Sequence, residues 1–94
     1  MEALSSLREI LKQKEKLRED RESKIKEAQS FIEQLKEEVR RAGIYVVTIT
    51  FRDKTRLFIN LHRNYIEIDG RVVIMEKDYE RILRLKKQEV IEVK

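Results

Sequence analysis

The chain has 94 residues and a net charge of +4, and 43% of its residues are charged. At this length it forms one small domain with at most one protruding element. It has no cysteine, which excludes disulfides, thiolate ligands and cysteine nucleophiles. No apolar run approaches the roughly 18 residues that a membrane span needs, and residues 1–4 lack the pattern of a signal peptide. We therefore expect an intracellular, cytoplasmic protein that does not enter a membrane.

Both signs of charge are abundant, with 22 Lys and Arg against 18 Asp and Glu. Proteins of hyperthermophiles are enriched in this way, because the desolvation of ions costs less at high temperature. The composition therefore predicts a thermophilic source, and the small excess of positive charge alone does not predict a nucleic-acid partner. Proline is absent and there are only two glycines, so we expect no flexible linker between the segments 1–43 and 44–94.

The first segment is predicted to be a helix that covers residues 6–42. Ser6 followed by Glu9 is a capping-box pattern, which is typical of a helix start. At the other end, Gly43 can adopt the left-handed conformation that ends many helices, and Ile44 can fold back onto the last turn.

Apolar residues recur along this helix at alternating spacings of three and four, as in a heptad repeat. Nine of the twelve a and d positions are apolar. A straight helix drifts by about 20° per heptad against such a repeat, so the pattern favours a left-handed supercoil with a partner helix. The twelve positions are Leu4, Leu7, Leu11, Lys14, Arg18, Arg21, Ile25, Ala28, Ile32, Leu35, Val39 and Ala42.

The middle of this seam is polar, which leaves two alternatives. The helix could break near Asp20 and fold back as a hairpin, or it could continue with a solvated centre. We favour the continuous helix, because no Gly or Pro marks a turn and the heptad frame is kept. At 1.5 Å per residue it would be about 55 Å long, too long for residues 44–94 to cover. We therefore predict a homodimer whose interface contains Leu4, Leu7, Leu11, Ile25, Ala28, Ile32 and Leu35.

The second segment is predicted to begin with a β-hairpin. Residues 44–51 and 57–62 are rich in β-branched and aromatic residues and alternate in polarity, and residues 52–56 form a polar turn. A loop with an odd number of residues keeps the apolar side chains of both strands on one face. We expect a three-residue loop that pairs Phe51, Ile49 and Val47 with Leu57, Ile59 and Leu61.

A second hairpin is predicted over residues 65–75, with Asp69 and Gly70 as the preferred pair of a type I′ turn. A short helix over about 76–87 and a possible last strand over 89–93 follow. The predicted fold is α+β, with an antiparallel four-stranded sheet that packs by one apolar face on the C-terminal half of the long helix.

Little in the sequence indicates catalysis. His62 is the only histidine, and no spacing typical of a metal site or of a Gly-rich phosphate loop occurs. Glu67, Asp69 and the triplet Glu92-Val93-Lys94 follow the order of the acidic residue and Glu-x-Lys in restriction-type metal-dependent nucleases. Such a triplet is ordinary in so charged a chain, and we expect a solvated edge strand. We predict no enzyme activity, metal, cofactor or small-molecule substrate.

The turn of the first hairpin is the best candidate for a nucleic-acid contact. Arg52, Lys54 and Arg56 crowd its tip, and Phe58 and His62 share the outward face of the sheet. Basic residues around an exposed aromatic ring are a minimal platform for single-stranded nucleic acid. The simpler interpretation is a charged turn that protects the sheet from aggregation, with Phe58 covered.

Two functions follow from these patterns. The leading hypothesis is a non-enzymatic structural or regulatory interaction module that dimerises through its N-terminal helix. The alternative is a dimeric nucleic-acid-binding protein that uses the hairpin tip and the sheet face.

Overall fold

A computed structural model describes residues 2–94 of the chain, with side chains from Glu19 onward. It has the α+β architecture expected from the sequence, with a five-stranded antiparallel sheet instead of a four-stranded one. The elements in chain order are α1 (Glu2–Arg41), β1 (Val46–Phe51), β2 (Arg56–Asn60), β3 (Tyr65–Ile68), β4 (Arg71–Val72), α2 (Met75–Lys86) and β5 (Val90–Val93).

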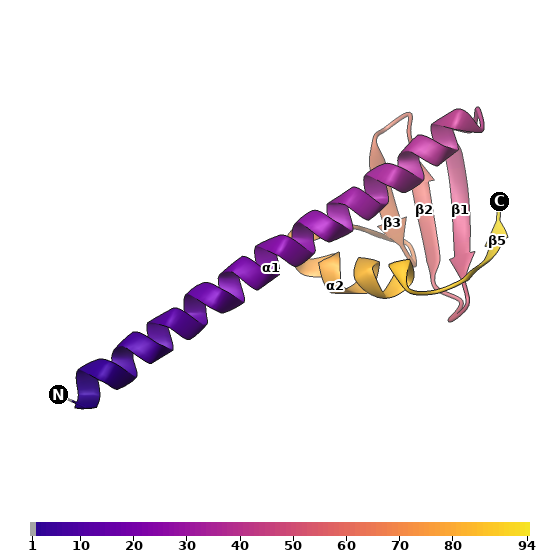
Figure 1. Ribbon diagram of the computed structural model, residues 1–94. Helices are drawn as coiled ribbons and strands as arrows, with labels where there is room; N and C mark the ends of the chain where they lie inside the picture. The colour runs from indigo at the N-terminus through magenta and orange to yellow at the C-terminus, as the bar shows by residue number, and fades with distance from the viewer. Residues whose placement is uncertain (1) are drawn as a thin grey trace.

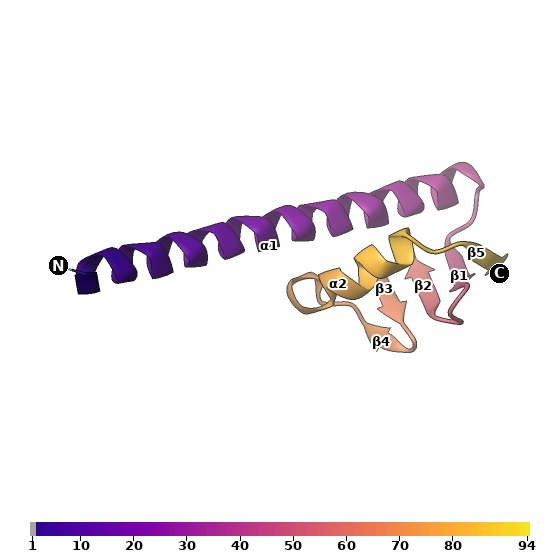
Figure 2. The same cartoon turned by 60° about the horizontal axis from the view of Figure 1, so that its bottom comes forward.

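The sheet and the two helices form two layers. The strand order is β4-β3-β2-β1-β5, so the last strand returns to lie beside the first. Both helices lie on one face of the sheet, here called the helix face (Figures 1 and 2). Within the described residues no element covers the opposite face, here called the open face (Figure 2).

Helix α1 is continuous across its polar middle, which confirms the preferred alternative. It begins at Glu2 rather than near Ser6, so the expectation of a capping box that starts the helix at Ser6 is wrong. Residues 2–5 contain no Gly or Pro, and nothing in their backbone preference opposes a further helical turn.

The end of α1 is fixed by local hydrogen bonds, as the sequence predicted. Gly43 has a φ of +72°. Its amide donates to the carbonyl of Arg40 at 2.9 Å, and the amide of Ile44 donates to the carbonyl of Val39 at 3.1 Å. These two bonds form a Schellman motif, which satisfies carbonyls that the helix end leaves free. The chain therefore turns back sharply into β1.

The first hairpin has the predicted three-residue loop, but its register differs from the expectation. Ile49 lies opposite Leu57, and Val47 lies opposite Ile59, a shift of two residues from the expected pairs. A shift of two residues keeps every side chain on its face. The alternation of polarity therefore cannot distinguish the two registers.

The chemistry of the turn selects the observed register. The amide of Phe51 donates to the carbonyl of Thr55 at 2.9 Å, so these two residues close the loop. Lys54 adopts a left-handed conformation with a φ of +73°. A carboxylate oxygen of Asp53 accepts the amide of Thr55 at 2.9 Å. This is a three-residue loop with a left-handed last residue, a common hairpin connection.

The second hairpin has the predicted tight turn. Asp69 and Gly70 have φ values of +51° and +84°, the two positive angles that a type I′ turn requires. The chain leaves this turn through the two-residue strand β4 and enters α2. At the start of α2, the Asp78 carboxylate accepts the amide of Ile74 at 2.9 Å, which satisfies a donor near the helix start.

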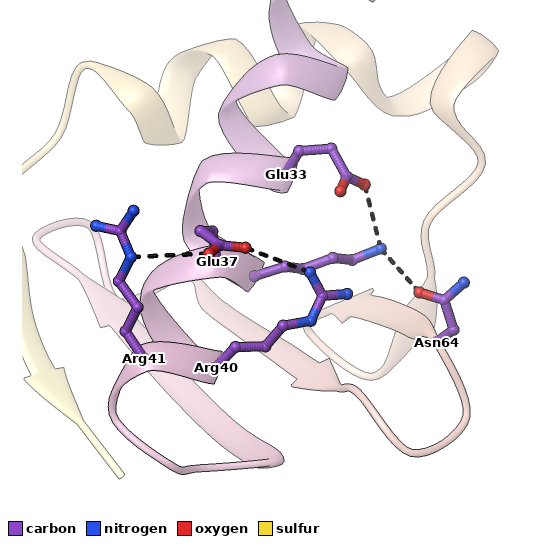
Figure 3. Close-up of polar contacts among 6 residues, drawn as sticks. Glu33, Glu37, Arg40, Arg41 and Asn64 are labelled. Carbon is purple, nitrogen blue, oxygen red and sulfur yellow. Dashed lines mark hydrogen bonds and ion pairs between the residues drawn. The ribbon is translucent and has the colours of Figure 1, made fainter.

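Polar contacts hold the C-terminal half of α1 over the sheet. Lys36 Nζ lies 3.3 Å from Asn64 Oδ1, in the turn between β2 and β3, and 3.6 Å from Glu33 Oε1. One turn later, Glu37 forms ion pairs with Arg40 and Arg41 at 3.5 and 3.7 Å (Figure 3). The contact of Lys36 with Asn64 joins α1 to the sheet, whereas the two pairs of Glu37 lie within α1.

The core lies between the helix face and the two helices. Strands β1, β2 and β3 contribute alternate residues, α1 contributes its C-terminal half and α2 contributes one face. The buried apolar residues are Ala28, Ile32, Val39, Val47, Ile49, Phe51, Leu57, Ile59, Ile66, Ile68, Ile82 and Leu85.

Candidate functional site

The heptad seam of α1 is divided between two environments. Ala28 and Ile32 are buried in the core of their own chain, Leu35 packs against this core, and Ile25 is half-buried. Leu4, Leu7 and Leu11 belong to the same helix, but their side chains lie outside the described residues. The C-terminal part of the predicted interface thus has an intramolecular partner.

The boundary between the two environments lies near Arg21. Its guanidinium donates to the main-chain carbonyl of Glu76, at the start of α2, at 3.1 Å. N-terminal to this contact, α1 leads away from the sheet and α2 (Figures 1 and 2). The molecule is consequently elongated, with extents of 63 × 25 × 20 Å. We call residues 2–20 the projecting half of α1, and residues 21–41 the packed half.

The open face holds a second candidate site. Lys54, Arg56 and Phe58 line one shallow depression of about 570 Å³. Phe58 is half-buried, and its ring centroid lies 6.1 Å from that of Tyr65 on the neighbouring strand. Tyr65 was missed from the sequence, although the alternation of Tyr65 and Glu67 with buried isoleucines places both on the open face.

Two of the predicted nucleic-acid contacts lie elsewhere. The amide of Arg52 donates to the carbonyl of Glu89 at 2.9 Å, so this part of the turn faces the loop before β5. His62 lies at the opposite end of the β1–β2 hairpin and stacks on Tyr45 at a centroid distance of 4.9 Å. The structure therefore gathers three of the five predicted residues and separates the other two.

The charge on the open face is mixed. Glu67 and Asp69 line the same depression as the basic residues. Asp69 is held in place, because its carboxylate accepts the amide of Arg56 at 3.0 Å. A polyanion on this face would have to follow the rim formed by Lys54 and Arg56 and avoid the two carboxylates.

Asp53 has a structural role at the hairpin tip. Hydrogen bonds from Thr55, through its side chain and then its main chain, and from Gln88 lower the pKa of Asp53 below its ordinary 3.8. Gln88 Nε2 donates to the carboxylate at 3.0 Å, and Gln88 Oε1 accepts the Asp53 amide at 3.1 Å. This reciprocal pair joins the tip to the loop that precedes β5.

The nuclease-like order of acidic residues does not form a site. Glu67 is on β3 and Glu92 is on β5, with β2 and β1 between them. Three spacings of about 4.8 Å place these strands roughly 14 Å apart. Among the described residues, no three His, Cys, Asp or Glu side chains could together hold a metal ion.

Within residues 2–94, no helix has both the length and the apolar character that crossing a membrane requires. Comparison with known proteins found no family model, curated protein or solved structure that matches this chain.

Proposed function

We propose that this chain is a non-enzymatic, self-associating interaction module in which the projecting half of α1 pairs with the same segment of a second copy. The observation that supports this proposal is the length of α1, which continues from Arg21 to Glu2 beyond its contacts with α2. At 1.5 Å per residue the projecting half extends for about 28 Å.

The physical argument concerns the stability of an isolated helix. In proteins, most of the stability of a helix comes from the packing of an apolar face and not from helix propensity alone. In the projecting half the apolar seam positions are Leu4, Leu7 and Leu11, which recur on one side of the helix. Pairing of this side with a second helix would supply such packing.

The polar part of the seam limits the length of the pairing. Arg21 occupies a seam position and is engaged with α2 through Glu76. Lys14 and Arg18 occupy the two preceding seam positions, where like charges of two copies would repel each other. Contact between copies is therefore expected over the first three turns of α1, through a short interface.

The proposal is tested by light scattering of the full chain at micromolar concentration. Leu11→Glu introduces a charge into the seam and is expected to halve the molar mass relative to the parent. Gln13→Glu makes the same change of charge at an outward position two residues away and should keep the parent's mass. Equal masses for the parent and Leu11→Glu would refute this function.

A second function is supported by one observation, the depression that contains Phe58, Lys54 and Arg56 beside Tyr65. Bases of single-stranded nucleic acid can stack on exposed aromatic rings while phosphates follow a basic rim. We propose this binding as the alternative function of the open face. Glu67 opposes it, because it lies directly across from Phe58 in the sheet.

The alternative is tested by fluorescence anisotropy of labelled single-stranded DNA and RNA as salt is increased. Replacing Lys54 and Arg56 by Ser should weaken binding and lower the salt slope by up to about one unit per lost phosphate contact. Replacing Lys26 and Lys77 by Ser removes the same charge from the exposed surface of the two helices and should have a smaller effect. A parent that shows no salt-dependent binding would eliminate this function.

A further inference from the structure

The two edges of the sheet differ in what they offer to another strand. The strand order leaves β4 and β5 at the edges. β4 has only two residues, and a very short edge strand gives a neighbour little main chain to pair with. β5 has four residues, all exposed, and contains no proline. Of the two edges, β5 is the one where another strand has room to add.

The β5 edge is also apolar. Ile91 and Val93 are 55% and 59% exposed. Beside them, between the end of α1 and strands β1 and β5, lies a groove of about 330 Å³. Its lining is apolar except for Glu38, and Val93 and Ile44 are among its lining residues. One edge of the molecule thus has both an apolar hollow and apolar side chains that project next to it.

The main-chain N–H and C=O groups of β5 point toward β1 at some residues and toward the free edge of the sheet at others. The amide of Lys94 donates to the carbonyl of Thr48 at 2.9 Å, so the main-chain groups of Lys94 are directed toward β1. Main-chain groups of successive residues in an antiparallel strand point to opposite sides. The N–H and C=O of Val93 are therefore directed to the free edge, whereas an irregularity in the pairing with β1 interrupts this alternation between Val90 and Glu92.

We propose that this edge binds a second copy of the chain, with the two β5 strands antiparallel about a two-fold axis at Val93. In this register Val93 faces Val93 of the second copy, and Glu92 faces Lys94 of the second copy. The opposite charges stabilise the pairing, whereas an axis at Glu92 would place two glutamates in contact. Charge complementarity thus supports a second copy of β5 as the occupant, and it favours the register centred on Val93 over the one centred on Glu92.

The register joins the surfaces on both faces of the sheet. Val93 lies opposite Ile49 and therefore on the helix face, so the apolar hollows of the two copies become continuous beneath the ends of both α1 helices. Glu92 and Lys94 lie on the open face, where their charged groups are 2.9 Å apart within one chain. In the proposed pair, Glu92 of each copy can form its ion pair with Lys94 of the other copy, and both side chains stay on the open face. Such self-complementarity is the condition for a two-fold contact.

This interface is independent of the pairing proposed for α1, because β5 and the projecting half of α1 lie at opposite ends of the molecule (Figure 1). If both interfaces form, each chain has two different partners. The parent chain should then have a molar mass of four chains or more in solution.

The test uses the full chain with Leu11→Glu, in which the α1 pairing is removed. This variant should have twice the chain mass of 11.4 kDa. Adding Val93→Lys, which places two lysines in contact at the axis, should lower the mass to that of one chain. The matched control adds Val72→Lys on the opposite edge, where the valine is 58% exposed against 59% for Val93, and it should leave the mass at two chains.

A charge exchange tests the register. In the same Leu11→Glu chain, Glu92→Lys should shift the equilibrium toward one chain, and the further change Lys94→Glu should restore two chains. Compared with the Leu11→Glu chain, circular dichroism should show an unchanged fold after the changes at Val93, Val72, Glu92 and Lys94, because these four side chains are exposed.

The outcomes distinguish this edge from the α1 pairing. A Leu11→Glu variant with the mass of one chain, from a parent with the mass of two, would overturn the edge contact and support the α1 pairing. A Leu11→Glu variant that keeps the parent's mass of two chains and becomes one chain with Val93→Lys would support the edge and overturn the α1 pairing. If the Leu11→Glu chain has the mass of two chains and Val93→Lys does not change it, the proposed contact between the β5 edges is wrong. A parent with the mass of one chain would also overturn this contact.

Discussion

The two halves of α1 contain the same type of apolar seam in different surroundings. In the packed half, Ala28 and Ile32 are buried by the sheet and α2 of their own chain. The projecting half extends beyond both (Figure 2). A heptad repeat therefore specifies that one side of a helix needs cover, and it does not specify whether the cover belongs to the same chain or to another.

The comparison also separates two kinds of stability. The packed half is part of the core, so its helical structure is retained as long as the domain is folded. The projecting half depends on a second copy in our proposal, so its structure should depend on protein concentration. Two of the four predictions below test this difference, and the other two test local structure in the domain that the packed half joins; they run from the largest expected effect to the smallest.

The largest effect is expected from a charge in the packed half. Ile32→Asp places an unpaired carboxylate at a site that is 3% exposed. The cost should be several kcal/mol, a large part of a typical stability of about 5–15 kcal/mol. Thermal unfolding by circular dichroism should show a fall in melting temperature of more than about 10 °C. Gln34→Asp, on the exposed side of the same helix turn, should melt within a few degrees of the parent.

Hydrogen exchange should separate the two halves directly. On dilution below the dissociation constant, amides of residues 6–18 should exchange at least about tenfold faster, because an isolated helix of this length is marginal. Amides of residues 28–39 should keep their protection, since their packing is intramolecular. Protection of the projecting half that is independent of concentration would contradict its dependence on a second copy.

A smaller effect is expected at the joint between α1 and β1. Gly43→Ala places a side chain at a φ of +72°, and no atom lies within 4 Å of the added methyl group. The cost is therefore backbone strain alone, about 1 kcal/mol, measurable by urea unfolding. Gly43→Asn should cost less, because Asn tolerates this conformation. Neither change should alter the molar mass.

The smallest effect concerns the hairpin tip at low pH. Hydrogen bonds from Thr55 and Gln88 lower the pKa of Asp53, so its charged form stabilises the folded state. This contribution is complete well above pH 3.8 and is lost as the pH falls through the lowered pKa. Asp53→Asn should melt slightly below the parent at pH 6, and the difference should shrink toward zero by pH 2. A difference that grows on acidification would show that Asp53 destabilises the fold.

Much of the architecture could be predicted from the sequence, because it depends on neighbours in the chain. The Schellman end at Gly43 and the type I′ turn at Asp69 and Gly70 need only residues that tolerate positive φ angles. The continuity of α1 follows from the absence of Gly and Pro between its ends. The alternation of side chains assigned each residue of β1 and β2 to its face, because a strand has a period of two.

Contacts between distant segments were decided by the tertiary structure. The pairing of Ile49 with Leu57 depends on hydrogen bonds in the turn, since a shift of two residues leaves the polarity pattern unchanged. The fifth strand gains its position beside β1 through pairing across about forty residues of chain. The separation of His62 from Lys54 and Arg56 follows from the length of the hairpin.

The seam of α1 shows most clearly which features depend on the local sequence and which depend on the tertiary structure. Its period determined which side of the helix would be covered, because a stripe of apolar residues in water is unfavourable. The tertiary structure decided that the chain's own sheet and α2 cover Ala28 and Ile32. Only the positions of the sheet and of α2, which no local pattern encodes, determine where the intramolecular cover ends.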